Sequence, residues 1–205
     1  MIYLIRHTAP KVAKGICYGQ SDLDVMPTFA SEAEIIKSVL PNTLHAVYSS
    51  PLQRCTKLAQ ALFAQHTITT NPELMELNCG EWEMLHWDDI PKEIITPWYN
   101  DFVNVPIPAG ESYTMLYNRV INTFNQITQK HPTSNVAIVA HGGVLRSILS
   151  HITNTPLHLS FEAFKLHYGC VIAIQPTNLS FTYDILSNIN NTEEQHKPST
   201  TVAKQ

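Results

Sequence analysis

The 205-residue chain is 44% hydrophobic and 15% charged, a composition typical of a folded globular protein and unlike that of a disordered one. Its 13 Lys and Arg against 17 Asp and Glu give a net charge of −4, which argues against a broad nucleic-acid or anionic-membrane surface. Any anion site must therefore be a local concentration of positive groups. The length predicts one domain over residues 1–186, followed by a polar tail over 187–205.

The cysteines and the N-terminal residues indicate the cellular compartment in which the protein is expected. The four cysteines are widely spaced and form no CxxC pair, unlike the disulfide framework of a short secreted chain. The first residues lack the features of a signal peptide, and no apolar run approaches the roughly 20 residues that span a bilayer. We expect a cytoplasmic protein with reduced thiols and neither membrane nor nucleic-acid partners.

The first predicted element is a short buried strand within Met1–Ile5, which ends at a cation and an imidazole, Arg6 and His7. Open α/β sheets bind ligands in the crevice beyond the carboxyl ends of their strands. Both side chains are therefore candidate ligand-binding groups, although a lone His in this position is often only a buried structural residue.

A loop over residues 9–25 follows the strand. Gly19 would let the backbone approach a ligand, and Gln20 and Ser21 can donate hydrogen bonds. The same residues would also suit a plain surface turn. We retain both as candidate substrate contacts.

The next two elements are a helix and a strand. The pattern over Thr28–Leu40 predicts a helix, in which Ser31 and Glu34 resemble a capping box. Residues His45–Tyr48 predict the second strand.

The segment after this strand predicts a second helix with an unfavourably placed cation. Ser50 suits the N-cap, Pro51 the first helical position, and Gln53 completes a capping box. Arg54 then falls in the first turn, where a cation opposes the helix dipole. An anion in front of the helix would resolve that conflict, so Arg54 is a candidate anion ligand.

Residues 78–112 form a long excursion that is rich in Pro and contains all three tryptophans, Trp82, Trp87 and Trp98. Such an excursion is usually a lid or a binding wall. The alternative is an extra helical layer that packs its tryptophans inward.

The clearest buried strand of the chain, Asn135–Ala140, delivers a second imidazole, His141. A helix over 144–152 follows at once, and the N–H groups at a helix start form a ready anion site, here at Gly142. The remaining predicted elements are a strand over 68–70, a helix over 111–130, and a closing hairpin over 167–175 and 180–186.

These strand ends can converge. In an α/β fold with a mostly parallel central sheet and helices on both faces, Arg6, His7, Arg54 and His141 would share one crevice. Guanidiniums bind phosphate oxygens in a bidentate manner, and a neutral imidazole is a competent nucleophile near pH 7. The four side chains together predict a phosphoryl-transfer site.

Four motifs resemble those of the histidine phosphatase (phosphoglycerate mutase-like) superfamily, whose fold is a three-layer α/β/α sandwich. The resemblance implies a phosphohistidine at His7, with Arg6, Arg54 and His141 binding the phosphoryl oxygens. It also implies that Glu76 acts as the general acid. The motifs are Leu4-Ile5-Arg6-His7-Thr8, Ser49-Ser50-Pro51 with Arg54, Glu76 before Gly80-x-Trp82-Glu83, and His141-Gly142-Gly143 with Arg146.

Within this superfamily the chain most resembles the α-ribazole phosphatases of cobalamin nucleotide-loop assembly. The stretches that carry this resemblance are residues 17–22, 87–91 and 108–112. It implies a small-molecule phosphomonoester as substrate, with no cofactor and no metal, and Trp82 and Trp87 as candidates for substrate specificity. A homodimer is compatible with the sequence.

Other functions stay open at this level. They are a broad-specificity sugar or nucleotide phosphatase, a phosphoglycerate mutase, a non-catalytic phosphate-binding module and a metallohydrolase. The last is disfavoured because the ten histidines include no HExxH motif.

Overall fold

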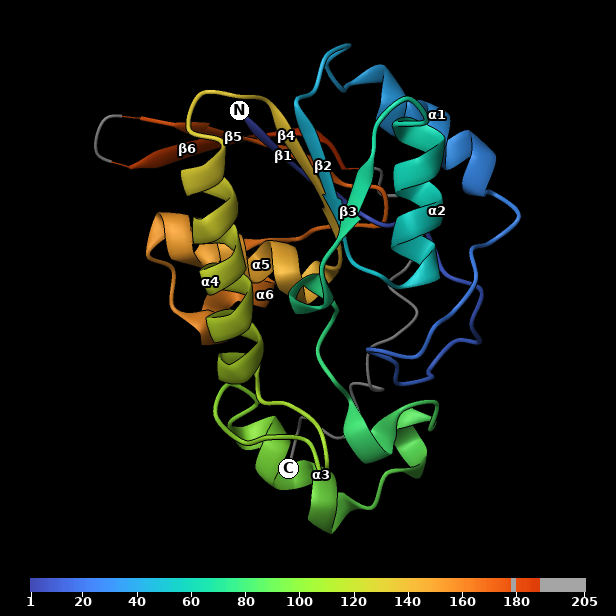
Figure 1. Cartoon of the computed structure of the whole chain (residues 1–205). Helices are drawn as coiled ribbons and strands as arrows, with labels where there is room; N and C mark the ends of the chain where they lie inside the picture. The colour runs from blue at the N-terminus through green and yellow to red at the C-terminus, as the bar shows by residue number, and fades with distance from the viewer. Residues whose placement is uncertain (178–179, 189–205) are drawn as a thin grey trace.

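The computed structural model describes residues 1–177 and 180–188, which fold around a six-stranded sheet of order β3-β2-β4-β1-β5-β6 (Figure 1). β1, β2, β3 and β4 are parallel, whereas β5 runs antiparallel to both β1 and β6. The predicted mostly parallel α/β sheet with a closing hairpin is confirmed. The strands are β1 Ile2–Arg6, β2 Ala46–Ser49, β3 Ile68–Thr70, β4 Val136–Ala140, β5 Val171–Pro176 and β6 Phe181–Ser187.

Helices cover both faces of the sheet, in three layers. Alternate strand residues point to opposite faces, so Leu4 packs in one hydrophobic core with α4 and α5, and Ile5 packs in the other with α1 and α2. Figure 1 shows the sheet between these two helix pairs. The main helices are α1 Phe29–Ser38, α2 Gln53–Leu62, α3 Lys92–Asn100, α4 Tyr113–Lys130, α5 Gly142–Thr153 and α6 Ser160–Ala163, with short 3-10 turns at Pro72–Leu74, Gly80–Trp82, Trp87–Asp89 and Leu157–Leu159.

Both predicted capping boxes are wrong. α1 begins after Thr28 without a side-chain cap, and Ser31 donates its hydroxyl to the Thr28 carbonyl. α2 begins only at Gln53, whose backbone N–H donates to the Asp22 carboxylate at 2.7 Å. A partner distant in sequence has therefore replaced the local cap of α2, whereas α1 has no side-chain cap.

The excursion over residues 78–112 is a compact helical layer rather than an irregular loop. It holds α3 and two 3-10 turns, and Figure 1 shows it (green) beyond the end of the sheet at which β2 leads into α2. Apolar side chains of the excursion form a hydrophobic cluster together with Cys17 of the loop over residues 9–25. The buried members of that cluster are Cys17, Cys79, Trp82, Ile90, Ile95 and Ile107.

The C-terminal elements differ in detail from the prediction. β5 begins at Val171, because residues 168–169 form a turn where a strand was predicted. Ser187, predicted to open the polar tail, closes β6, and the Asn188 side chain binds the backbone of Lys165 and His167. Residues 189–205 of the predicted tail lie outside the described residues.

Two further findings concern the described part of the chain as a whole. None of its helices combines the length and the apolar character that a membrane crossing requires. All four cysteines are buried free thiols.

Candidate active site

The two strand-end histidines lie side by side, as predicted. β1 and β4 are neighbouring parallel strands, and the His7 backbone N–H donates to the Ala140 carbonyl at 3.0 Å. The ring centroids of His7 and His141 are 5.0 Å apart, with the planes at 64°. The His7 Nδ1 lies 2.7 Å from the Thr8 carbonyl oxygen. A carbonyl only accepts, so Nδ1 carries the proton and the lone pair of the neutral ring is on Nε2, the nitrogen suited to attack phosphorus.

His141 is held as a neutral imidazole. Its Nε2 lies 2.7 Å from the Ser50 hydroxyl, and its ring is fully buried at the start of α5. Burial, and then the charges of Arg54, His7 and Arg6, hold the pKa of His141 well below its usual range. It is therefore suited to hydrogen bonding with the phosphoryl group rather than to carrying a positive charge.

Two guanidiniums meet at the N-terminus of α5. Arg6 donates to the Leu166 carbonyl and stacks 4.2 Å over the ring of Tyr168, while Arg146 Nε donates to the Phe164 carbonyl at 3.1 Å. A methyl group added at Gly142 would lie 3.0 Å from the Nη1 of Arg146 and 3.3 Å from the Cζ of Arg6. The absence of a side chain at Gly142 is what lets both cations approach the helix start.

Arg54 lies outside the cavity lining, with its guanidinium 5.5 Å from the ring centroid of Tyr18, which lines the cavity. It is fully buried, and its Nη1 and Nη2 donate to the carbonyls of Ser21 and Gly19 at 2.8 and 2.6 Å. Its Nε–H, also buried, has no hydrogen-bond partner among the described residues. Its charge nevertheless acts on the site, because it contributes to the lowered pKa of His141.

Gln20 and Ser21 are not brought into the cavity. Their backbone N–H groups and the Ser21 hydroxyl donate to the carboxylate of Glu83. The Gln20 side-chain amide donates to the Glu76 carbonyl at 3.0 Å. Neither residue lines the cavity, and their predicted contact with the phosphoryl group stays a prediction.

Glu76 lies in the cavity wall, at the start of α5. Its Oε2 accepts from the Gly143 N–H and its Oε1 from the Leu77 N–H, each at 3.0 Å. Arg119 binds the Glu76 backbone carbonyl at 2.9 Å and pairs its charge with Glu111. A purely structural Glu76 would have paired its carboxylate with that arginine. The carboxylate partner of Arg119 is Glu111 instead.

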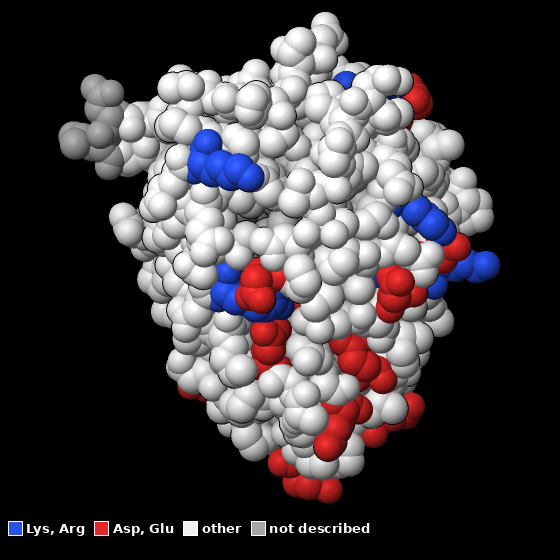
Figure 2. All heavy atoms as spheres, viewed as in Figure 1, with Lys and Arg blue, Asp and Glu red and all other residues white. Residues whose placement is uncertain are grey.

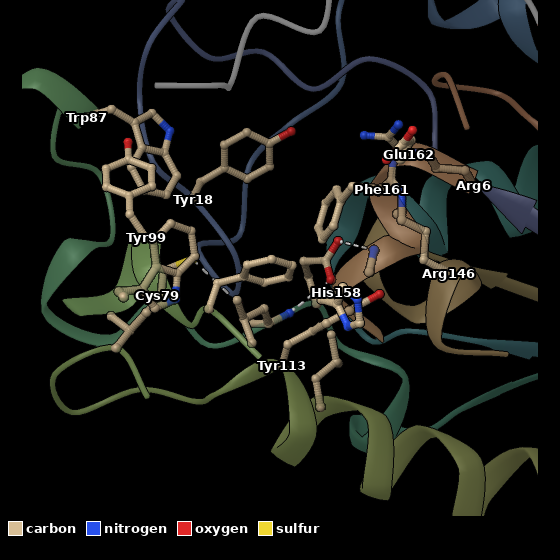
Figure 3. A pocket seen from close by; sticks show the side chains of 18 of the residues that line it. Arg6, Tyr18, Cys79, Trp87, Tyr99, Tyr113, Arg146, His158, Phe161 and Glu162 are labelled. Carbon is tan, nitrogen blue, oxygen red and sulfur yellow. Dashed lines mark hydrogen bonds between the residues drawn. The ribbon is translucent and has the colours of Figure 1, made fainter. Parts of the chain in front are cut away.

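A cavity of about 500 Å³ is bordered by Arg6, His7, Glu76 and Arg146 and by the two glycines at the start of α5, whereas the buried His141, like Arg54, does not line it. Most of the remaining cavity wall is aromatic. Figure 3 shows Trp87, Tyr99 and Tyr18 on one side, and Phe161, Arg146 and Arg6 on the other. The aromatic lining residues are Tyr18, Trp87, Trp98, Tyr99, Phe102, Tyr113, Phe161 and Tyr168.

The two tryptophans predicted to set specificity have different places. Trp87 lines the cavity together with Trp98, their rings 5.8 Å apart and 26° from parallel. Trp82 is only 3% exposed and lies in the apolar cluster of the excursion, in edge contact with both of the others. Trp82 thus supports the cavity wall from within the cluster. Trp98, and not Trp82, lines the cavity beside Trp87.

The sequence did not predict the residues of the cavity wall that faces Trp87 and Trp98. His158, Phe161 and Glu162 come from the 3-10 turn at Leu157–Leu159 and from α6, elements too short to show a hydrophobic period. Phe161 is 47% exposed and lies 4.6 Å from the Arg146 guanidinium. Arg146 itself could have been singled out, since it follows His141 in a motif already noted.

Two imidazoles and two guanidiniums at a helix start, within a three-layer α/β/α fold, suit the binding of a phosphoryl group. Among the described residues, no group of three or more His, Cys, Asp or Glu is placed to hold a metal ion. The family model of the histidine phosphatase superfamily (branch 1) matches residues 2–189. The chain belongs to that superfamily and is a phosphatase.

Known relatives span several phosphatases. The chain is 31% identical to a metal-independent phosphoserine phosphatase of Arabidopsis thaliana over 74% of its own length and 68% of the relative's. It is 26% identical to an adenosylcobalamin/alpha-ribazole phosphatase of Salmonella typhimurium, covering 84% and 89%. The crystal structure of the alpha-ribazole phosphatase from Shigella flexneri superposes with a TM-score of 0.81 at 25% identity, covering 90% of this chain and 94% of that one.

Proposed function

We propose that the enzyme hydrolyses a phosphomonoester with a nucleoside-like leaving group, α-ribazole 5′-phosphate, through a phosphohistidine on His7. The observation that carries this proposal is the aromatic cavity of about 500 Å³ beside the phosphoryl site. A flat ring system finds stacking surfaces there, at Trp87, Trp98 and Phe161, which a small sugar or amino-acid phosphate would leave uncovered.

The reaction takes place in two transfers. In the first, His7 Nε2 attacks phosphorus, the bond to the ester oxygen breaks, and protonated Glu76 delivers its proton to the departing alkoxide. In the second, water attacks the phosphohistidine, Glu76 accepts the proton of the water, and the P–N bond breaks to release inorganic phosphate. Arg6, His141 and the N–H groups at the start of α5 stabilise the charge on the phosphoryl oxygens.

The charge of the excursion favours a substrate that carries only one phosphate. Residues 78–112 contain seven Asp and Glu and one Lys, a balance of 1 − 7 = −6. Figure 2 shows acidic side chains concentrated on the half of this face that the excursion occupies. A negatively charged excursion disfavours the approach of polyanions such as bisphosphoglycerate or a nucleoside triphosphate, which weighs against the mutase alternative.

Phosphoserine is the second candidate, because the Arabidopsis relative bears that activity in its name. Phosphoserine is small and zwitterionic, and it would make little use of the aromatic wall. Its carboxylate would also need a cation besides those that face the phosphoryl group.

The test is a comparison of kcat/KM for α-ribazole 5′-phosphate, phosphoserine and ribose 5-phosphate. Stacking of a base on aromatic side chains is worth about 1–3 kcal/mol. We therefore expect α-ribazole 5′-phosphate to exceed ribose 5-phosphate in kcat/KM by at least about fivefold. A preference for phosphoserine, or equal values for all three substrates, would overturn the assignment.

A further inference from the structure

The carboxylate of Glu83 forms an unusually dense set of hydrogen bonds with the loop over residues 19–21. It accepts from the backbone N–H groups of Gly19 at 3.1 Å, Gln20 at 2.7 Å and Ser21 at 3.2 Å, and from the Ser21 hydroxyl. A fifth donor is the N–H of Cys79, at 3.2 Å. Glu83 thus joins the loop to the start of the excursion.

Arg54 holds the same loop through its carbonyl groups. Its Nη2 donates to the Gly19 carbonyl and its Nη1 to the Ser21 carbonyl. The peptide N–H groups therefore bind a carboxylate and the peptide carbonyls bind a guanidinium, so that the loop lies between two opposite charges. Each charge is compensated through the peptide dipoles of the loop.

The loop has little freedom to move. A methyl group added at Gly19 would lie 1.8 Å from the Leu77 carbonyl oxygen, which shows how closely the backbone is packed there. Asp22, the next residue along, accepts from the Gln53 N–H at the start of α2, one residue before Arg54. The position of Arg54 is thus tied to the loop at both its side chain and its backbone.

Glu83 keeps its charge at neutral pH. Burial by itself raises the pKa of this carboxyl, but the hydrogen bonds from Ser21, Gln20, Gly19 and Cys79 outweigh it and leave the pKa below its ordinary value. An ionised carboxylate can accept from all five donors, which an amide side chain cannot do.

We propose that Glu83 is a positioning residue for phosphoryl transfer. Acting through the loop 19–21, it fixes the Arg54 guanidinium beside His141. Glu83 does not line the cavity, so it acts on the reaction through the residues that the loop holds, above all Arg54, and not on the substrate. The inference rests on the proposed phosphoryl-transfer function and on the role toward the phosphoryl group that the family resemblance implies for Arg54. Because Glu83 belongs to the excursion, the excursion would then help to hold Arg54 in place.

The test is a double-mutant cycle of Glu83→Gln and Arg54→Ala, with hydrolysis of nitrophenyl phosphate as the assay. Because this assay does not depend on the natural substrate, it leaves the α-ribazole assignment aside. We expect Glu83→Gln to lower kcat by about 10-fold or more while KM changes less than about threefold, since misplaced donors lose transition-state stabilisation. In the Arg54→Ala background, the same change should lower kcat by less than about threefold, because the residue through which Glu83 acts is gone.

Two further variants serve as controls. Glu81→Gln removes an exposed carboxylate two residues away and should leave kcat unchanged. Ser21→Ala removes one of the five donors and keeps the Glu83 charge, so it should give a smaller loss of kcat than Glu83→Gln. This loss should also shrink in the Arg54→Ala background, and circular dichroism should show an intact fold. A normal kcat in Arg54→Ala would show that Arg54 does not act on the reaction, and the proposed role of Glu83 would then have no basis. A slow Arg54→Ala with additive losses, or with a fully active Glu83→Gln, would overturn the role of Glu83 alone.

Discussion

At the scale of single residues, the site depends on backbone groups that fix the side chains which react. The Thr8 carbonyl sets the tautomer of His7, and the Gly143 and Leu77 N–H groups hold the Glu76 carboxylate. Such fixed partners reduce the reorganisation that the transition state would otherwise require. Small changes beside these residues should therefore have specific effects on the chemistry.

The effect of Glu76→Gln should depend on the leaving group. An alkoxide must be protonated as the P–O bond breaks, whereas nitrophenolate leaves unaided. We expect single-turnover phosphoenzyme formation to slow by about 100-fold or more on a sugar phosphate and far less on nitrophenyl phosphate. Equal losses on the two substrates would exclude Glu76 as the acid.

Gly143→Ala should reproduce this dependence on the leaving group while leaving the Glu76 side chain chemically unchanged. A methyl group there would lie 2.3 Å from Glu76 Oε1 and force the carboxylate out of place. We expect a larger loss of kcat on a sugar phosphate than on nitrophenyl phosphate, measured as the ratio of the two. A ratio equal to that of the wild type would show that the acid does not depend on this placement.

At the scale of elements, the strand ends of the site were predictable and much of the cavity wall was not. Apolar runs that stop at Arg6 and at His141 mark strand tips, and parallel strands present their tips at one edge. The cap of α2 was not predictable, because the Ser50 hydroxyl binds His141, which follows the neighbouring strand β4 but lies far away in the sequence. Nor does a sequence tell which tryptophan of the excursion faces inward.

The structure separates the roles of Trp82 and Trp87, and two alanine variants test that separation. Trp87→Ala should lower kcat/KM for α-ribazole 5′-phosphate by about 5-fold or more and spare nitrophenyl phosphate, since it removes a stacking surface. Trp82→Ala should instead cost about 3–5 kcal/mol of unfolding free energy, because it leaves a hole in the apolar cluster. Substrate kinetics and thermal melts on both variants give the comparison, and matching behaviour of the two would contradict it.

At the scale of the whole molecule, stability should fall as the solution becomes acidic. The folded protein holds the pKa values of His141, Glu83 and Glu111 below their ordinary values. For Glu83 and Glu111, burial raises the pKa, but the hydrogen bonds lower it by more; for His141, burial itself lowers the pKa. The unfolded chain then binds more protons, so stability is present above the unfolded pKa and is lost as the pH falls through the folded one.

The loss should begin below about pH 6.5, where an unfolded His takes up a proton, and continue below about 4.5 as the carboxyls do. Urea unfolding measured at intervals from pH 7 to pH 4 gives the curve. His141→Gln should flatten its upper part, between about pH 6.5 and 5. A wild-type stability that is constant or rises toward pH 4 would contradict these assignments.

The central claim is that His7, and not His141, carries the phosphoryl group. His7 presents Nε2 as its unprotonated nitrogen, whereas His141 is buried with its Nε2 on Ser50. The most direct measurement is rapid quenching of the enzyme during turnover, followed by mapping of acid-labile, base-stable phosphate by mass spectrometry. We predict that the phosphate is found on His7 in the wild type and that His7→Ala forms no phosphoenzyme. Phosphate on His141, or a fully active His7→Ala, would contradict this mechanism.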